Sequence, residues 1–413
     1  MKILIKNIQE LVQVETEPVQ KRSGKEMARL ATIKNAWLAI ENGVIADFGP
    51  MDTLGITDWN NLEIIDADGK MVFPSWCDSH THIVYAGSRE GEFVDRINGL
   101  TYAEIANKGG GILNSARKLQ ETSEDVLFEQ ALKRLKAVQK TGTGAIEIKS
   151  GYGLTVDAEL KMLRVIKRLK AVSPLTIKAN FLGAHALPTE FKENREGYID
   201  LLINEILPVV KAEGLADYID IFCETGYYTP EEADRILEAG VAAGLTPKIH
   251  VNQFTAIGGV QVGVKHKALS VDHLEVMREE DFDALAGSET MPTLLPSCSF
   301  FLGIPYAPAR TFMDKGLPVS LATDFNPGSS PSGNMPFVVS LGCIRMKMTP
   351  EEAINAATIN AAYAMGLSAT HGSIAVGKQA NVFITKEMPS YAYLPYSFGS
   401  DLIDTVIVGG QVV

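Results

Sequence analysis

Two histidines stand one residue apart at the end of an apolar run in the segment FPSWCDSHTHIVYAG, residues 73–87. Successive side chains of a β-strand point to opposite faces, so His80 and His82 are expected to project to the same side. A single histidine on an apolar face is usually a hydrogen-bonded core residue. A pair at this spacing instead favours two metal ligands, because imidazole is a common ligand of zinc and iron.

Histidine and aspartate also close other apolar runs. His250 ends the run in PKIHVNQF, and Asp324 ends the run in SLATDFNPGSSP. Together with the first pair they offer three imidazoles and one carboxylate, which suit one divalent metal per chain, zinc or iron, without separating the two. A structural zinc would need a closed set of four ligands at short spacings, whereas a catalytic metal keeps an open position. The pattern therefore favours a catalytic metal.

Two further histidines fall at equivalent places. His273 ends the run in SVDHLE, and His185 ends the run in FLGAHA, so five of the seven histidines of the chain close an apolar run. Each of these two could be a core residue if taken alone. Their common position favours a site that they share with the metal ligands.

An alternation of short apolar runs with helical stretches must position these residues. Eight β-branched, apolar runs recur: KMVFPSWCDSH, GTGAIEIKSG, TIKANFLGAH, DYIDIFCET, TPKIHVNQF, ALSVDHLE, TMPTLLP and LPVSLATDFN. Helical periodicity dominates between them, and several helical stretches open with Ser or Thr as N-cap. Because the runs lack strict alternation, they fit a parallel sheet covered on both faces. We predict an α/β fold in which residues 71–375 form a (β/α)8 TIM barrel, with the site at the carboxyl ends of its strands.

The two chain ends break this alternation. Four segments there look like antiparallel strands with Gly, Asn or Asp at their turns: WLAIENGVIADFG, EIIDADG, QANVFITKE and DTVIVGGQVV. We predict that residues 1–70 and 376–413 together form one small β-sandwich-like domain.

The composition restricts the partners of the protein. The net charge of −12 over 413 residues, without a basic block, makes nucleic acid and anionic membranes poor partners and favours a small-molecule substrate. No stretch approaches the roughly 20 apolar residues of a membrane span, and the N-terminus lacks a secretory signal. The four cysteines have no CxxC spacing and suit reduced thiols, so we expect a cytoplasmic protein. A homodimer is compatible with the sequence.

The order of these features resembles the amidohydrolase superfamily: HTH ends the first strand, histidines end the fifth and sixth, and an aspartate ends the eighth. Within it, AGSREGEF, EIKSGYGL, GAHALP and TDFNPGSSP resemble the members that hydrolyse 4-imidazolone-5-propanoate to N-formimidoyl-L-glutamate in histidine degradation. The resemblance covers essentially the whole chain. It implies a metal-dependent hydrolase that opens a cyclic amide with an activated water.

The resemblance also implies a role for each site residue. The metal ligands would be His80, His82, His250 and Asp324, and the substrate-binding residues would be Arg89, Tyr152, His185, Gln253, Asn326, Gly328 and Ser329. Arg89 can offer a bidentate fork to the propionate of the substrate. The loop after Asp324 can add backbone N–H groups and a hydroxyl. Asp324 and His273 are the catalytic candidates, and either one could carry the proton.

Two alternatives remain open. A deaminase or cyclic amidase of the same superfamily would share the metal site, but Arg89 and the NPGSS loop suit an aliphatic carboxylate. A non-catalytic barrel scaffold would be expected to lack ligands, and all four are present. Gln253 stands where some members carry glutamate, and since an amide cannot accept a proton, we expect it to bind substrate. Lys149 lies near the rim, but the resemblance is to members with one metal and no bridging carboxylated lysine.

Overall fold

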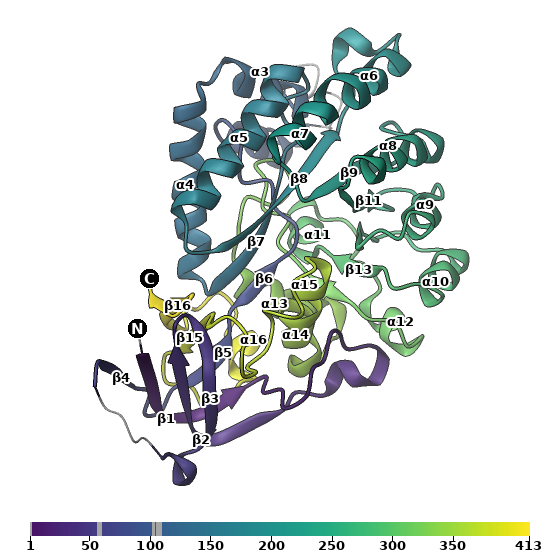
Figure 1. Cartoon of the computed structure of the whole chain (residues 1–413). Coiled ribbons are helices and arrows are strands. Elements are labelled where there is room, and N and C mark those ends of the chain that lie inside the picture. Colours follow the sequence, from purple (N-terminus) through teal and green to yellow (C-terminus); the bar gives the residue numbers. More distant parts are fainter. Residues whose placement is uncertain (1, 56–59, 101–103, 105–109) are drawn as a thin grey trace.

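The computed structural model describes residues 2–55, 60–100, 104 and 110–413. Within these residues, parallel strands and the helices around them form a barrel, and a second sheet from both chain ends lies at its side (Figure 1).

The barrel sheet has the strand order β14-β13-β12-β11-β9-β8-β7-β6, with β10 paired to β9, and its neighbouring strands are parallel. All eight predicted runs contribute a strand, which confirms the α/β barrel. The strands are β6 (Trp76–Asp78), β7 (Thr143–Lys149), β8 (Thr176–Ala184), β9 (Tyr218–Cys223), β10 (Thr246–Pro247), β11 (Ile249–Val251), β12 (Ser270–His273), β13 (Met291–Leu294) and β14 (Ser320–Leu321).

Contacts between the first and last strands close this barrel. The backbone N–H of Asp324 donates to the carbonyl of His80 at 3.0 Å. The Asp78 carboxylate accepts a hydrogen bond from the Thr323 hydroxyl at 2.7 Å. Two candidate metal ligands far apart in the sequence are thereby brought side by side.

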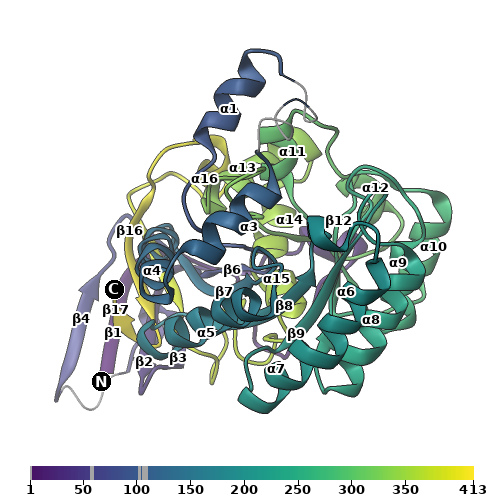
Figure 2. The same ribbon diagram turned by 90° about the horizontal axis from the view of Figure 1, so that it is seen from above.

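The helices follow the strands and surround them when the molecule is seen from above (Figure 2). They are α1 (Glu90–Ile97), α3 (Ile112–Glu121), α4 (Glu124–Lys140), α5 (Val156–Val172), α6 (Arg195–Leu201), α7 (Leu207–Glu213), α8 (Pro230–Ala242), α9 (Gly259–Lys265), α10 (Glu279–Ala286), α11 (Pro296–Leu302), α12 (Ala309–Asp314), α13 (Met335–Met346), α14 (Pro350–Ala357), α15 (Ile359–Ala364) and α16 (Tyr393–Tyr396).

Local sequence signals explain where several helices begin and break. The side chains of Ser123, Thr155 and Thr229 cap α4, α5 and α8 as their sequences predict. The helical segment between β8 and β9 is divided into α6 and α7 by a π-helical turn just before Pro208, which lacks the N–H that a regular helix would use. Another is broken between α14 and α15 at Thr358, whose hydroxyl donates to a carbonyl four residues earlier.

The second sheet is built from both chain ends. Its order is β17-β16-β15-β5-β1-β2-β3, with β4 also paired to β1. The strands are β1 (Lys2–Val12), β2 (Thr32–Glu41), β3 (Val44–Pro50), β4 (Leu62–Asp66), β5 (Met71–Pro74), β15 (Val382–Thr385), β16 (Ile403–Val408) and β17 (Gln411–Val412). The sheet curves until the β2–β3 turn meets the segment before β15, where the N–H of Ala380 donates to the carbonyl of Gly43 at 2.9 Å. It thus encloses a core of its own.

Two details of this sheet differ from the sequence prediction. β4, predicted as an antiparallel strand, runs parallel to β1, because it pairs with the edge of β1 opposite β2 and is reached by a connection longer than a tight turn. The residues Met71–Pro74, predicted as part of the first barrel strand, pair instead with β1 and β15. We therefore propose that the boundary between the two units lies at Ser75.

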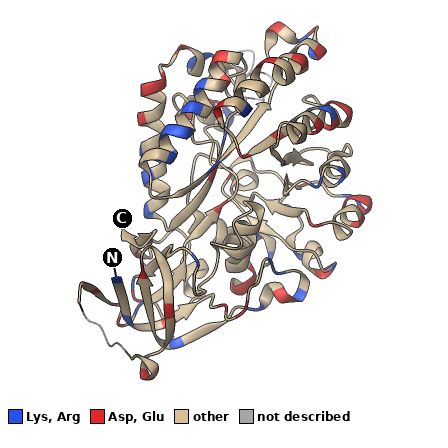
Figure 3. Cartoon of the chain, viewed as in Figure 1, with Lys and Arg blue, Asp and Glu red and all other residues tan. Residues whose placement is uncertain are grey.

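Charged residues of both signs are interspersed along the outer helices (Figure 3). This distribution agrees with the sequence, in which basic residues form no block. Among the described residues, no helix combines the length and the hydropathy that crossing a membrane would require.

Candidate active site

The residues predicted for metal binding and proton transfer lie together at the carboxyl ends of the barrel strands. They are at most 3% exposed, and they lie near or just beyond the carboxyl ends of β6, β11, β12 and β14: His80, His82, His250, His273 and Asp324. The backbone φ angles of His273 and Asp324 are +92° and +53°, which residues with a side chain adopt rarely. The structure therefore brings all five together in one buried group of side chains, which we call the chamber.

The ring nitrogens in this chamber lie close to each other and to a carboxylate. The Nε2 atoms of His80 and His82 are 3.3 Å apart and lie 3.5 and 3.4 Å from Oδ1 of Asp324. Donor atoms of His80, His250 and His273 also lie within 4.8 Å of one another. Nitrogen lone pairs that converge in this way on a carboxylate oxygen are arranged to share a cation.

Two aspartates orient these imidazoles. Oδ2 of Asp272 lies 2.6 Å from Nδ1 of His80, and Oδ1 of Asp220 lies 3.0 Å from Nδ1 of His250. With Nδ1 bonded to a carboxylate, Nε2 keeps its lone pair. Nε2 of His250 is buried and has no hydrogen-bond partner among the described residues, so its lone pair is available to a cation.

Buried lysines and a glutamate form ion pairs that hold these two aspartates in place. Nζ of Lys149 lies 2.5 Å from Glu147, 2.8 Å from Asp220 and 3.8 Å from Asp272. Lys248 also pairs with Glu147, and none of these five side chains is exposed. Burial would lower the pKa of Lys149, but the surrounding carboxylates raise it above the ordinary value. The surrounding carboxylates thus favour the ammonium form of Lys149.

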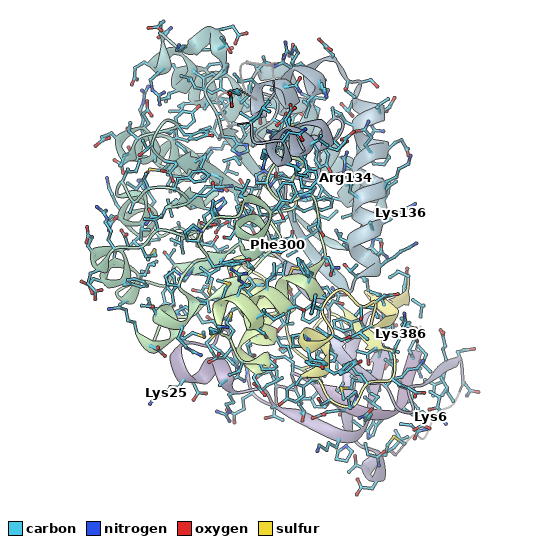
Figure 4. All side chains as sticks on the ribbon, turned by 180° about the vertical axis from the view of Figure 1, so that it is seen from behind. Lys6, Lys25, Arg134, Lys136, Phe300 and Lys386 are labelled. Carbon is cyan, nitrogen blue, oxygen red and sulfur yellow. The ribbon has the colours of Figure 1, made fainter. Side chains whose placement is uncertain are left out.

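We expect Lys149→Met to destabilise the protein by about 3–5 kcal/mol, since it leaves Glu147, Asp220 and Asp272 without their shared cation. The free energy of unfolding, measured by denaturant titration, checks this value. The control is Lys136→Met on the exposed face of α4 (Figure 4), which should change stability by about 0.5 kcal/mol or less. Equal losses in both variants would contradict a special role of the buried network.

The pKa values of the two catalytic candidates shift in opposite directions. Burial would raise the pKa of Asp324, but the hydrogen bond from His82 and the nearby imidazoles lower it below the ordinary value. Burial would lower the pKa of His273, but Glu275 and Asp324 raise it. At neutral pH the aspartate is therefore a carboxylate, and His273 is favoured as a hydrogen-bond donor.

Two predicted substrate-binding side chains stand beside the metal-ligand candidates. The ring of His185 stacks on the ring of His82 with centroids 5.2 Å apart, and the ring of Tyr152 lies 5.4 Å from that of His185. Nδ1 of His185 lies 3.2 Å from the carbonyl of Gly151, so this bond fixes the ring on the SGYG loop. The two rings therefore pack at one side of the metal-ligand candidates.

Arg89 passes over the loop that follows Asp324. Its Nε and Nη2 atoms lie 2.9 and 2.5 Å from Oε2 of Glu92, which leaves Nη1 directed elsewhere. A Cβ atom at Gly328 would come within 2.1 Å of this Nη1, so a larger residue there would displace the guanidinium from its present position. Glu92 therefore holds the Arg89 guanidinium in place above the loop that follows Asp324.

The Asn326 side chain forms hydrogen bonds with the backbone of this loop. Its Oδ1 accepts hydrogen bonds from the backbone N–H groups of Gly328 and Ser329, both at 2.8 Å. These N–H groups are therefore occupied, in contrast to our expectation that they could hold a substrate carboxylate. The Ser329 hydroxyl accepts a hydrogen bond from Nδ2 of Asn326 at 2.8 Å and lies 3.5 Å from Oδ2 of Asp324.

Arg134 on α4 positions the segment between the histidine pair and Arg89, a role that the sequence did not reveal (Figure 4). Its Nη1 donates to the carbonyls of Ile83 and Tyr85 at 2.9 and 3.0 Å. The guanidinium also stacks on the Tyr85 ring, 3.4 Å from its centroid. The contact fixes the chain that leads from the metal-ligand candidates to Arg89.

Cys298 is a chamber residue that sequence reasoning missed. It is fully buried near the start of α11, and its Sγ accepts a hydrogen bond from Nε2 of Gln253 at 3.3 Å. Donor atoms of Cys298, His273 and Asp324 lie within 4.8 Å of one another. Its position just beyond the seventh barrel strand was the available signal, because every strand of such a barrel ends at the site.

Comparison with known proteins agrees with this geometry. Residues 71–413 match the Amidohydrolase family. The chain is 64% identical over 410 residues to a protein of Flavobacterium johnsoniae named imidazolonepropionase, covering 99% of both. Proteins of the same name from Christiangramia forsetii and Geobacillus kaustophilus are 63% identical over 413 residues and 45% identical over 392 residues. These matches cover 100% of both chains in the first case, and 94% of this chain and 92% of the relative in the second.

Solved structures share the fold. A triazine hydrolase variant superimposes with a TM-score of 0.76 at 17% identity and covers 100% of this chain and 94% of its own. The guanine deaminase of E. coli superimposes with a TM-score of 0.75 at 14% identity and covers 100% of this chain and 99% of its own. At these identities the likeness concerns the architecture alone.

Proposed function

Since the chain belongs to the amidohydrolase family, we propose that it hydrolyses 4-imidazolone-5-propanoate to N-formimidoyl-L-glutamate, the imidazolonepropionase step of histidine degradation. The observation that carries this proposal is the identity of 60–64% over the full chain to three relatives of that name. The free thiols of all four cysteines suit a reducing compartment, so we also propose a cytoplasmic location.

The donor set of the chamber fits one divalent metal ion. The residues that would hold it are His80, His82, His250 and Asp324. The unpartnered Nε2 of His250 and the two nitrogens within 3.5 Å of Oδ1 of Asp324 support this assignment. Imidazole and carboxylate ligands favour zinc or iron over magnesium or calcium. A bound ion of this kind makes water more acidic and polarises a carbonyl oxygen.

The remaining chemistry falls to the side chains around the reacting amide. Water adds to the ring carbonyl carbon, and the bond between that carbon and the ring nitrogen breaks. Asp324 accepts the proton of the water and returns it to the departing nitrogen, because its carboxylate is buried beside the reacting atoms. His273 donates a hydrogen bond to the carbonyl oxygen as negative charge grows there.

Substrate recognition uses the side chains beside the metal ligands and the loop that follows Asp324. His185 and Tyr152 present their rings to the imidazolone, and Gln253 offers its amide. Arg89 binds the propionate, with the Ser329 hydroxyl beside it. A deaminase of the same family would have no need of a cation for an aliphatic carboxylate, and a scaffold protein would have no need of the oriented donors, so neither alternative accounts for the site.

The experiment that tests the substrate follows the ultraviolet absorbance of 4-imidazolone-5-propanoate in the presence of wild-type enzyme and Arg89→Met. The variant leaves the propionate facing an apolar side chain, at a cost of about 2–5 kcal/mol. We therefore expect kcat/KM to fall by roughly 30-fold or more.

An imidazolone analogue without the carboxylate is the control. Wild-type enzyme should process it poorly, and Arg89→Met should lose little further activity on it. Equal losses on both substrates would mean that Arg89 supports the fold instead of the substrate. Turnover of aminopurines or aminopyrimidines in place of the imidazolone would favour the deaminase alternative.

A further inference from the structure

We propose that the chamber contains a second, inhibitory site for a thiophilic divalent cation, formed by His273, Cys298 and Asp324. The inference rests on the proposed function, because it takes the resident metal to be held by the two histidines of the HTH segment, His250 and Asp324.

The three side chains form a compact donor group. One donor atom from each lies within 4.8 Å of the other two, and the side chains are 3%, 0% and 3% exposed. Asp324 can serve both sites, since its two oxygens face different neighbours. Oδ1 lies 3.4 Å from Nε2 of His82, whereas Oδ2 lies 3.5 Å from the hydroxyl of Ser329.

His273 adds an imidazole donor to this group. Its Nδ1 atom pairs with Oε1 of Glu275 at 3.5 Å, which fixes the orientation of the ring. A catalytic metal needs only about three or four protein ligands, so His273 and Cys298 are in excess of the first ion. The chamber thus contains more donors than one metal requires.

The sulfur is arranged to act as a ligand. Nε2 of Gln253 donates a hydrogen bond to Sγ of Cys298 at 3.3 Å, so the sulfur accepts from the chain and its own proton can be replaced by a cation. Thiolate and imidazole together select zinc or cadmium over magnesium or calcium. On binding, the thiol proton passes to solvent and a metal–sulfur bond forms, with no change of oxidation state.

Occupation of this site would stop turnover. The cation would engage His273 and the second oxygen of Asp324, which the proposed mechanism uses for the carbonyl oxygen and for proton transfer. We expect kcat to fall by roughly 10²-fold, the range for loss of acid–base catalysis. Excess zinc would thereby inhibit an enzyme that zinc also activates.

The experiment adds Cd²⁺ to enzyme already loaded with one equivalent of zinc. Total bound metal after dialysis, the thiolate-to-cadmium charge-transfer absorption and the activity are measured together. Wild-type enzyme should take up one further equivalent, show the absorption band and lose activity. Cys298→Ala should bind no further equivalent, show no band and keep the activity that it has with one equivalent of zinc.

Cys343→Ala is the matched control, since this thiol on α13 is only partly buried and lies outside the donor group. It should behave as wild type. Cys298→Ser, with nearly the same volume, replaces the alanine variant if that variant folds poorly. A band that persists without Cys298, or an uptake of one metal only, would overturn the second site. A wild-type chain that retains no zinc at all would instead contradict the resident metal site and with it the proposed function.

Discussion

Asp324→Asn is expected to lower kcat by roughly 10²-fold or more while the protein keeps part of its metal, because an amide oxygen can contact a cation but cannot accept and return a proton. The carboxylate is buried, and Oδ1 lies 3.4 and 3.5 Å from Nε2 of His82 and His80. Its lowered pKa keeps it in the basic form at neutral pH. Steady-state kinetics and elemental analysis of the same metal-loaded sample check both parts of the prediction.

The matched variant is His273→Gln, which retains an N–H donor toward the carbonyl oxygen. If His273 only donates a hydrogen bond, this variant should lose less activity than Asp324→Asn. A nearly normal kcat in metal-loaded Asp324→Asn, together with a collapse in His273→Gln, would move the proton transfer to His273. The pair of variants therefore decides between the two catalytic candidates that the sequence left open.

The sequence predicted those parts of the molecule that depend on local pattern and order along the chain. Buried parallel strands have a continuous apolar signature, so eight runs were recognisable before any pairing was known. Since every strand of a parallel barrel ends at the same rim, the positions of His80, His250 and Asp324 at strand ends were sufficient to place them together. The helix caps at Ser123 and Thr229 were equally local.

The sequence did not predict contacts between side chains that point into the barrel from different strands. Asp220, Asp272 and Lys149 lie within strands, and their position on the inner face depends on register across the sheet. Cys298 resembled any isolated thiol until the turn after β13 placed it against Asp324. The occupied N–H groups of Gly328 and Ser329 likewise follow from the conformation of one side chain.

The strand pairing of the terminal sheet could not be predicted from local sequence either, for a related reason. The β4 sequence carries turn residues that also suit an antiparallel hairpin, but the choice of edge is set by packing against β1. β5 illustrates the same effect, because one apolar run supplies strands to two sheets on either side of Ser75. Local preference decides that such segments are extended, whereas tertiary contacts decide their partners.

Removal of the metal is expected to abolish turnover and to lower the thermal stability of the folded chain. The first effect follows because uncoordinated water is a poor nucleophile toward an amide at neutral pH. The second follows because the ion binds the assembled donors and not the unfolded chain, which at a hundredfold excess over Kd contributes about 2.7 kcal/mol. Activity and the thermal midpoint are measured before dialysis against a strong chelator, after it, and after metal is returned.

The choice of returned metal makes this prediction specific to the donor set. Zinc or ferrous iron should restore both activity and the thermal midpoint, because imidazoles dominate the site. Magnesium should restore neither, since it prefers oxygen ligands and gives up its waters reluctantly. The stability readout needs no substrate, so it tests the donors even if the proposed substrate is wrong. Full activity in a metal-free sample, or restoration by magnesium, would contradict the assignment of His80, His82, His250 and Asp324 as ligands of a catalytic ion.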